Sequence, residues 1–595
     1  MAELHHERLA LVRAELARRG LAGFVVPRAD EYQGEYLPPS AERLSWLTGF
    51  TGSAGLAVVL ADGAAILTDG RYTIQVRTEV SAADYAIRHQ TEEPLAAWLI
   101  DEHPPGGRVG YDPWLHTTNW VETQRAELTR AGIELVPVES NPVDAVWLDR
   151  PAPPLAPVTI QPLAYTGWPA EAKRADIAAM LRHTGTKAAV LTMPESVAWL
   201  LNIRGGDVPR TPVALSFAIL HDDERVELFI DPRKLSPEIV AHFGAGVTVL
   251  PPGAFIGHLE GLGRAGLRVR VDAGSAASTV IACLGSAGAV VERAPDPTLL
   301  PRARKTAAEV AGARAAHLRD GVAMVRFLCW LSGAVAEGVT ELGAAARLED
   351  FRREGALFRD LSFETISGAG ANGAIVHYRV TEASSRKLES GTLYLVDSGA
   401  QYQDGTTDIT RTIAIGEPAC AARERFTRVL KGHIALARVR FPAGTTGSQL
   451  DVLARLPLWE AGLEYDHGTG HGVGSYLSVH EGPQRISKMP SRTALESGMI
   501  LSNEPGCYVA GAYGIRIENL MVVRASQQMC AGKPMLDFET LTLVPIDRTL
   551  VDADLLDDRE LAWLDGYHAR VFQALAPLLG AADAAWLEAA TLPLG

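Results

Sequence analysis

Apolar residues recur at helical spacing near the amino terminus and then give way to short β-rich runs. Leucine and valine residues from Leu4 to Leu16 lie three to five positions apart, which predicts an amphipathic helix over residues 4–19. Runs rich in valine, leucine and isoleucine, bounded by turn residues, then predict strands at 21–27 and within 56–70. This first block therefore has the pattern of an α/β domain.

A second block repeats this layout. A helix is predicted at 170–183, and strands are predicted at 187–193, 213–220 and 226–231. The segments "RLSWLTGFTGSAG" and "SVAWLLNIRGGDV" both place Trp-Leu before a short glycine loop, and "ILTDGRY" and "LFIDPRK" both end a strand with an aspartate. These parallels indicate an internal duplication of one α/β unit.

The third block starts with a long predicted helix after Lys305, with apolar positions from Val310 to Phe327. Helices and hairpin-like strands alternate after it, which is typical of an α+β domain. The proline-rich segment "LDRPAPPLAPV" predicts a linker between the first two blocks. We therefore expect domains at 1–155, 156–303 and 304–595.

Composition and charge exclude several classes of partner. The chain has 595 residues, a formal net charge of −15 and 47% hydrophobic residues. An acidic excess disfavours binding to nucleic acid or to anionic lipid, because both need clustered lysine and arginine. The five cysteines are widely spaced, no apolar run is long enough to cross a membrane, and the amino terminus lacks the apolar core of a signal peptide. We expect a cytoplasmic protein without a membrane span.

A predicted hairpin in the third block carries two aspartates. In "GTLYLVDSGAQYQDGTTDITRTIAI" (391–415), Asp397 ends one β-rich arm and Asp408 begins the other. Because paired strands lie about 5 Å apart, the two carboxylates can meet and bind a divalent cation. The alternative is that both lie in solvent beside a turn. Asp404 is the better candidate for that role, because Asp404-Gly405 forms the turn itself.

Two glutamates follow in "GMILSNEPGCYVAGAYGIRIENLMVV" (498–523). Glu504 ends one apolar run, and Glu518 is predicted to lie inside an apolar strand. A charged side chain in such a strand needs a partner or a metal. Alternation along a strand places Arg516 on the same face as Glu518. Arg516 is therefore expected either to pair with Glu518 or to orient a metal-bound Glu518.

A histidine cluster completes the set of candidate ligands. The segment "HGTGHGVGSYLSVHEGP" contains His467, His471 and His480 among five glycines, although the whole chain has only 16 histidines. Four carboxylates with one imidazole form an oxygen-rich site that suits Mn²⁺ and still permits Co²⁺ or Zn²⁺. Four negative ligands also balance two divalent cations, so a paired site is close to neutral.

These motifs resemble the metal-site motifs of the pita-bread metallopeptidases, which include methionine aminopeptidase, prolidase and Xaa-Pro aminopeptidase. The segments "SWLTGFTGSAG", "ILTDGRY", "WLLNIRGGDV" and "LTLVPIDRTLVDADLL" extend the resemblance to the long, three-domain cytosolic Xaa-Pro aminopeptidases. The resemblance implies two creatinase/prolidase-like α/β domains followed by a pita-bread catalytic domain. It also implies a homodimer. Two positions depart from the family pattern: Thr306 stands where asparagine is frequent, and Cys507 where tyrosine is usual.

The resemblance also implies roles for individual residues. The implied metal ligands are Asp397, Asp408, His471, Glu504 and Glu518, with Asp408 and Glu518 bridging two ions. The implied substrate site contains His377, His467, His480, Phe363 and Arg516, with Phe363 as an aromatic wall for proline. Without the resemblance, a lone His377 is more typical of a core histidine, and His467 of a residue that supports His471.

The implied activity is release of the residue before a penultimate proline by a hydroxide shared between two divalent ions, expected to be Mn²⁺. Glu504 is expected to accept the proton of the attacking water, His480 to stabilise the oxyanion, and His377 to position the scissile bond. Two alternatives remain open. A prolidase hydrolyses only Xaa-Pro dipeptides, and a non-catalytic pita-bread protein only binds peptides.

Overall fold

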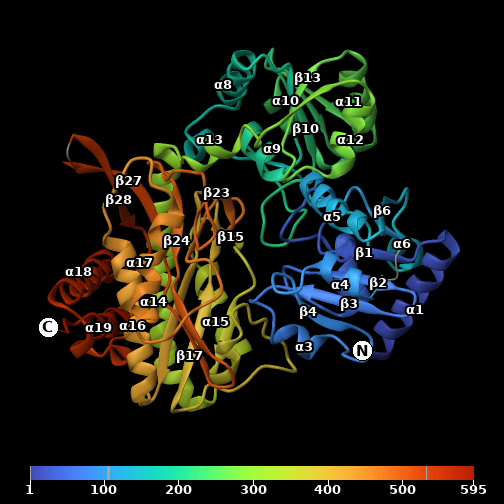
Figure 1. Ribbon diagram of the computed structural model, residues 1–595. Helices are drawn as coiled ribbons and strands as arrows, with labels where there is room; N and C mark the ends of the chain where they lie inside the picture. The colour runs from blue at the N-terminus through green and yellow to red at the C-terminus, as the bar shows by residue number, and fades with distance from the viewer. Residues whose placement is uncertain (1, 103–106, 531, 595) are drawn as a thin grey trace. The chain divides into compact units, whose positions relative to one another are not determined.

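The computed structural model describes residues 2–102, 107–530 and 532–594, and its helices and strands are labelled in Figure 1. The chain folds into two compact units, Met1–Pro162 with Trp168–Leu299 and Leu163–Gly167 with Leu300–Gly595. The domain boundaries expected from the sequence, at 155/156 and 303/304, stay predictions. Of the described helices, none combines the length and apolar character that spanning a membrane requires.

The first unit opens with helix α1 (Ala2–Arg19) and a six-stranded mixed sheet. Strand β1 pairs antiparallel with β2 and parallel with β5, and the full order is β4-β3-β2-β1-β5-β6. The strands are β1 (Gly23–Pro27), β2 (Leu56–Leu60), β3 (Ala64–Thr68), β4 (Ala86–His89), β5 (Arg108–Tyr111) and β6 (Glu134–Pro137). The predicted helix and strands of the first block are confirmed, and the run at 56–70 is a two-strand hairpin.

The second half of this unit has the same topology. Its sheet has the order β12-β11-β10-β8-β13-β14, with β8 antiparallel to β10 and parallel to β13. The strands are β8 (Ala188–Leu191), β10 (Phe217–His221), β11 (Val226–Phe229), β12 (Val247–Leu250), β13 (Arg268–Val271) and β14 (Val290–Arg293). The predicted helix at 170–183 is α8 (Ala170–His183). Because every strand pairing is repeated with the same polarity, the internal duplication is confirmed.

The repeated Trp-Leu motifs form equivalent helices in the two halves. Helices α2 (Arg43–Thr48) and α9 (Pro194–Leu201) both end at a residue in the left-handed region. That residue is Gly49, with φ 81°, in the first half and Asn202, with φ 51°, in the second. Glycine and asparagine are the residues that tolerate this conformation best, so both sequences encode the same helix stop.

Helices of the second unit surround its strands. The long predicted helix is α14 (Ala307–Ala334), and Thr306 caps it in a reciprocal pair with Glu309. Thr306, which departs from the family pattern, therefore serves as an N-cap. Such a cap stabilises a helix by about 1 kcal/mol. The other helices of at least ten residues are α15 (Glu341–Arg353), α16 (Cys420–Arg438), α17 (Gly447–Trp459), α18 (Asp558–Leu575) and α19 (Ala581–Ala590).

Two sheets of the second unit carry the candidate ligands. The larger has the order β21-β28-β27-β24-β22-β23, and the smaller has the order β16-β17-β20. Helix α16 contacts β24, β25 (Gly506–Val509), β26 (Tyr513–Arg516) and β28, which buries the apolar core between helix and strands. The larger sheet consists of β21 (Phe441–Pro442), β22 (Gly470–Gly472), β23 (Glu481–Ile486), β24 (Ile500–Asn503), β27 (Asn519–Cys530) and β28 (Lys533–Thr540). The smaller consists of β16 (Ile366–Ala369), β17 (Thr392–Ser398) and β20 (Ile409–Ile415).

Two expectations from the sequence are corrected here. The hairpin is present as the antiparallel pair β17 and β20, but Asp404 at its tip is buried and forms an ion pair with Arg319. Solvent exposure of Asp404 was therefore wrong, because helix α14 supplies a cation that covers the turn. Glu518 lies between β26 (Tyr513–Arg516) and β27 rather than inside one strand, and its N–H donates to the Thr410 carbonyl of β20 at 3.1 Å.

Buried neutral histidines predict that acid destabilises the fold. Burial lowers the pKa of His116 and His568 to about 4 and that of His433 to about 3. The unfolded chain takes up the corresponding protons near pH 6.5, so it binds more protons than the folded chain between about pH 4 and 6.5. The free energy of unfolding should therefore fall as the pH drops through this window.

The variant His568→Asn removes one such site. In urea denaturation of metal-free protein, its free energy of unfolding should change with pH less steeply, by up to about 1.4 kcal/mol per pH unit. Replacing the exposed His183 by asparagine is the control and should leave the slope unchanged. Equal slopes for wild type and His568→Asn would contradict the assignment.

Candidate metal centre

Strands β17 and β20 present two buried aspartates near the tip of their hairpin. Asp397 of β17 lies opposite Thr410, and Asp408 immediately precedes β20. Asp397 is 7% exposed and Asp408 is 4% exposed. The charge of Asp397 contributes to raising the pKa of Asp408, so the two carboxylates lie within electrostatic reach of each other. Both aspartates are therefore buried, and the solvent-exposed alternative is wrong.

Glycines explain how His471 reaches this site. His471 lies in β22 between Gly470 and Gly472. A Cβ at Gly470 would lie 2.1 Å from the Ser502 carbonyl oxygen, and a Cβ at Gly472 would lie 2.1 Å from that of Glu481. Both positions must therefore be glycine for β22 to fit between β23 and β24. The imidazole Nδ1 bonds to the Gly472 carbonyl at 3.0 Å, which leaves Nε2 directed at the carboxylates.

The two glutamates approach from neighbouring segments. Glu504 directly follows β24, and the Ser502 hydroxyl donates to its Oε1 at 3.1 Å. Glu518 is 1% exposed, and the Thr410 hydroxyl donates to its Oε2 at 2.8 Å. Thr410 belongs to β20, so the strand that follows Asp408 also orients Glu518.

These side chains form one compact cluster. His471 Nε2 lies 3.5 Å from both Asp408 Oδ2 and Glu504 Oε1. Asp408, His471 and Glu518 each offer a ligand atom, and those atoms lie within 4.8 Å of one another. Within the described residues, the buried oxygens Asp397 Oδ1, Asp408 Oδ1 and Glu518 Oε1 have no hydrogen-bond partner. Buried carboxylate oxygens are normally satisfied, so three unsatisfied ones fit a site for hard divalent cations.

The pKa shifts of these side chains also indicate a site for positive charge. Burial, reinforced by neighbouring carboxylates, raises the pKa of Asp408 and of Glu518 above the usual range. Burial lowers the pKa of His471, but the Asp408 hydrogen bond and the charges of Asp408 and Glu504 outweigh it and raise this pKa to about 9. The site therefore attracts positive charge, whether protons or metal ions.

Arg516 pairs with Asp397 rather than with Glu518. Its Nη2 donates to Asp397 Oδ2 at 2.6 Å, and its Nε donates to the Thr410 hydroxyl at 3.0 Å. Direct pairing of Arg516 with Glu518 was therefore wrong, because Thr410 lies between the two side chains. Arg516 instead orients Asp397 and reaches Glu518 through Thr410.

Tyr508 is a site residue that the sequence reasoning missed. Arg516 Nη1 donates to its hydroxyl at 2.6 Å, and His467 Nε2 lies 2.8 Å from the same oxygen. His467 is thereby connected to Asp397 through Tyr508 and Arg516. Alternation from Glu504 along the next strand is the signal that could have found it, because Tyr508 is four residues further on.

The remaining predicted residues surround this cluster. The His480 ring packs edge-on against the His471 ring, with centroids 4.4 Å apart. His377 is half-buried in a turn after Ala374, and the neighbouring Val376 carbonyl accepts from Arg516 Nη1 at 3.4 Å. Phe363 is buried in the bend after β15 (Phe358–Leu361).

Cys507 is enclosed in the core beside the site. It is 2% exposed and packs in the hydrophobic cluster that contains Phe426 and Ile515. Burial raises the pKa of its thiol, which disfavours the reactive thiolate. Cysteine therefore fills this space as a small apolar side chain.

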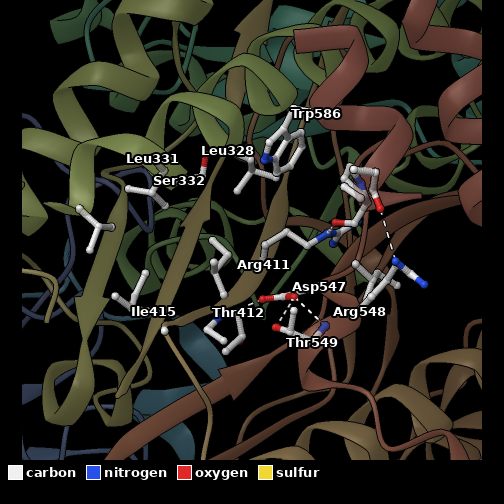
Figure 2. A pocket seen from close by; sticks show the side chains of 18 residues that line it. Leu328, Leu331, Ser332, Arg411, Thr412, Ile415, Asp547, Arg548, Thr549 and Trp586 are labelled. Atoms are coloured by element: carbon white, nitrogen blue, oxygen red, sulfur yellow. Dashed lines mark hydrogen bonds between the residues drawn. The ribbon is translucent and has the colours of Figure 1, made fainter. Parts of the chain in front are cut away.

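A separate pocket lies along β20, and Figure 2 shows it lined by apolar side chains with Arg411 and Asp547. Its volume is about 440 Å³, and none of the predicted site residues lines it. Consecutive residues of β20, from Arg411 to Ile415, contribute to its lining. Thr410, whose hydroxyl bonds to Glu518, is not among the lining residues.

Comparison with known sequences identifies the family. Residues 311–525 match metallopeptidase family M24, and residues 534–594 match the C-terminal region of that family. Residues 8–146 and 149–309 each match a creatinase/prolidase N-terminal domain. Aminopeptidase P2 of Arabidopsis thaliana is 39% identical over 613 residues, which cover 97% of this chain and 86% of that protein. The chain belongs to metallopeptidase family M24.

Two further relatives match this chain over nearly its whole length. A probable Xaa-Pro aminopeptidase P of Aspergillus niger is 38% identical, covering 99% of this chain and 98% of that protein. The X-prolyl aminopeptidase of Caenorhabditis elegans, described as a cytosolic enzyme with a di-nuclear active site, superposes with a TM-score of 0.95 at 34% identity. It covers 99% of this chain. The predicted fold, two related α/β domains followed by a pita-bread catalytic domain, is confirmed.

The close approach of β22 and β24 gives a test of this geometry. Gly470→Ala should push the strands apart and displace His471, because the added Cβ meets the backbone carbonyl of Ser502 at 2.1 Å. We expect a loss of roughly 1–3 kcal/mol in stability, measured by denaturation. Gly468→Ala is the matched control, since the nearest atom to its Cβ is 3.6 Å away. Equal stabilities of the two variants would contradict the packing described.

Proposed function

We propose that this protein is a metal-dependent aminopeptidase that releases the N-terminal residue from peptides with proline in the second position. The observation that carries the proposal is the compact set of four carboxylates around His471, three of them buried. It occurs in a chain that matches the nematode X-prolyl aminopeptidase over 99% of its length. Such a site suits hydrolysis of an amide bond with the help of divalent metal.

We propose that two divalent ions bind per chain. The ligands would be Asp397, Asp408, His471, Glu504 and Glu518. Three unsatisfied carboxylate oxygens support this set, and four negative ligands balance two divalent cations. The oxygen-rich donor set favours Mn²⁺, with Co²⁺ or Zn²⁺ as alternatives. When bound, the ions would supply Lewis acidity and lower the pKa of water.

The protein's own groups would then direct the reaction. Glu504 would accept the proton of the attacking water and pass it to the leaving proline nitrogen, with its carboxylate held by the Ser502 hydroxyl. His480, which packs against His471, would donate to the oxyanion. His377 would position the scissile bond, Phe363 would wall the proline pocket, and His467 would contact substrate.

Two other functions are less well supported. The dipeptidase PepE of Mycobacterium ulcerans superposes on 63% of this chain with a TM-score of 0.50, whereas the nematode X-prolyl aminopeptidase superposes on 99% with a TM-score of 0.95. A protein that only bound peptides would not need the unsatisfied carboxylate oxygens. We further propose a cytoplasmic location, as described for the nematode enzyme, and a homodimer, on the resemblance alone.

Substrate length distinguishes aminopeptidase from prolidase. A prolidase must bind the carboxylate that directly follows proline, whereas a longer peptide carries a neutral amide there. We expect cleavage of Xaa-Pro-Xaa tripeptides and of Arg-Pro-Pro peptides after the first residue, measured by mass spectrometry with Mn²⁺ added. Acetylating the amino terminus should abolish cleavage. Hydrolysis of dipeptides alone would identify a prolidase.

Two histidine variants separate metal binding from chemistry. His471→Ala should lose metal, because the wild-type His471 Nε2 lies 3.5 Å from both Asp408 Oδ2 and Glu504 Oε1. His480→Ala should keep its metal and lose about a hundredfold or more in kcat, the scale for one oxyanion donor. Elemental analysis and steady-state kinetics measure the two effects. If His480→Ala loses metal and His471→Ala keeps it, then His480 is the metal ligand and His471 is the oxyanion donor.

A further inference from the structure

Glu341 is a fully buried carboxylate outside the metal cluster. It is the first residue of α15, it is 0% exposed, and Thr340 caps the same helix. Among the described residues, the groups that bond to its carboxylate are uncharged N–H and O–H donors. Burying an unpaired carboxylate is expensive unless every oxygen is well supplied with hydrogen bonds.

The donors come from one segment of the chain. The N–H of Ala369 donates to Oε1 at 2.6 Å, and the N–H of Arg386 donates to Oε2 at 2.9 Å. The Asn372 amide lies 3.0 Å from both oxygens, and the Tyr378 hydroxyl lies 3.1 Å from Oε2. The Glu341 carboxylate thus bonds to residues at the beginning, in the middle and at the end of the segment 369–386.

This segment carries His377. It leaves β16 at Ala369 and has, after the short helix η5 (Gly370–Ala374), no further helix or strand before β17. His377 stands between Val376, whose carbonyl accepts from Arg516 at 3.4 Å, and Tyr378, whose hydroxyl meets Glu341. The residues before and after His377 are therefore held by two different groups, Val376 by Arg516 and Tyr378 by Glu341.

Close backbone packing supports the same constraint. A Cβ at Gly514 of β26 would lie 1.7 Å from the Gly373 carbonyl oxygen, so η5 lies directly on the strand that ends at Arg516. The Tyr378 ring packs with Ile366 and Leu395. A displacement of the Asn372 or Tyr378 contacts would therefore move the turn that holds His377.

We infer that Glu341 is a positioning residue for the reaction: its buried carboxylate, through Asn372 and Tyr378, holds the 369–386 segment so that His377 faces the metal site. This inference rests on the proposed function for its kinetic consequence. Its structural consequence, order in residues 369–386, does not depend on the substrate.

The test combines a double-mutant cycle with hydrogen exchange. Glu341→Gln places an amide N–H₂ against N–H donors and should lower kcat by roughly tenfold to a hundredfold, the scale of a misplacement of about 1 Å. Metal content should be unchanged. In a His377→Ala background the same substitution should cost nothing further, and hydrogen exchange of residues 370–386 should rise in the single variant.

Controls separate positioning from general destabilisation. Asp547 is a carboxylate of the same unit that accepts from the Ala414 and Thr549 N–H groups. Asp547→Asn should leave exchange of 370–386 unchanged, and its effect should add to that of His377→Ala. If Glu341→Gln fails to fold, Tyr378→Phe removes one donor, keeps the ring, and should show the same dependence on His377.

Several outcomes would overturn the inference. These are additive losses of kcat in the Glu341 and His377 variants, full activity of Glu341→Gln, or unchanged exchange in residues 370–386. If the wild-type protein cleaves no Xaa-Pro peptide, the proposed function fails, and the exchange experiment alone decides whether Glu341 orders this segment.

Discussion

The repulsion among buried carboxylates is the constraint on which the rest of the catalytic unit depends. Asp397, Asp408 and Glu518 are each less than a tenth exposed, and Glu504 joins them at His471. Like charges gathered in a weakly polar interior repel one another and oppose folding. Arg516 neutralises part of the charge at Asp397, and bound cations would neutralise the rest. The residues and strands around the site must hold these mutually repelling groups together.

A second layer of polar groups supports this arrangement. Arg411 donates to the Glu518 carbonyl at 2.7 Å and to Asn519 Oδ1 at 2.8 Å. Asn519 in turn contacts His433, which lies 3.1 Å from the Asn503 carbonyl beside Glu504. The backbones that follow β24 and precede β27 are thus cross-linked by fully buried side chains. Such outer contacts fix ligands before any metal arrives, so that little reorganisation is needed when it binds.

Local patterns predicted the elements better than the contacts between them. Helical periodicity placed α1 and α8 correctly, and the β-rich runs located the Asp397–Asp408 hairpin, because spacing along one element depends only on nearby residues. The partner of Arg516 was mispredicted since Thr410, 106 residues away, intervenes. Glu341 was missed for the same reason. Its role arises from contacts with residues 28 to 45 positions away, and a single buried carboxylate has no periodic signature. The resemblance to known motifs, rather than the pattern alone, supplied the five-ligand set.

The two kinds of candidate site residue are supported in different ways. Asp397 lies in a strand, Asp408 and Glu504 adjoin strands, and His471 is held between two glycines, so the sheets themselves define the geometry of these ligands. His377 instead lies in a segment with little regular structure, where no ladder of main-chain hydrogen bonds can fix it. The buried Glu341 carboxylate, with its several donors, holds that segment in position, as strand pairing holds the candidate ligands. Among the described donors, the Glu341 carboxylate accepts from residues 369–386, whereas Arg516 contacts both that segment and Asp397. On the proposed roles, loss of Glu341 would therefore affect how the peptide is held, and loss of Arg516 would affect both peptide positioning and metal retention.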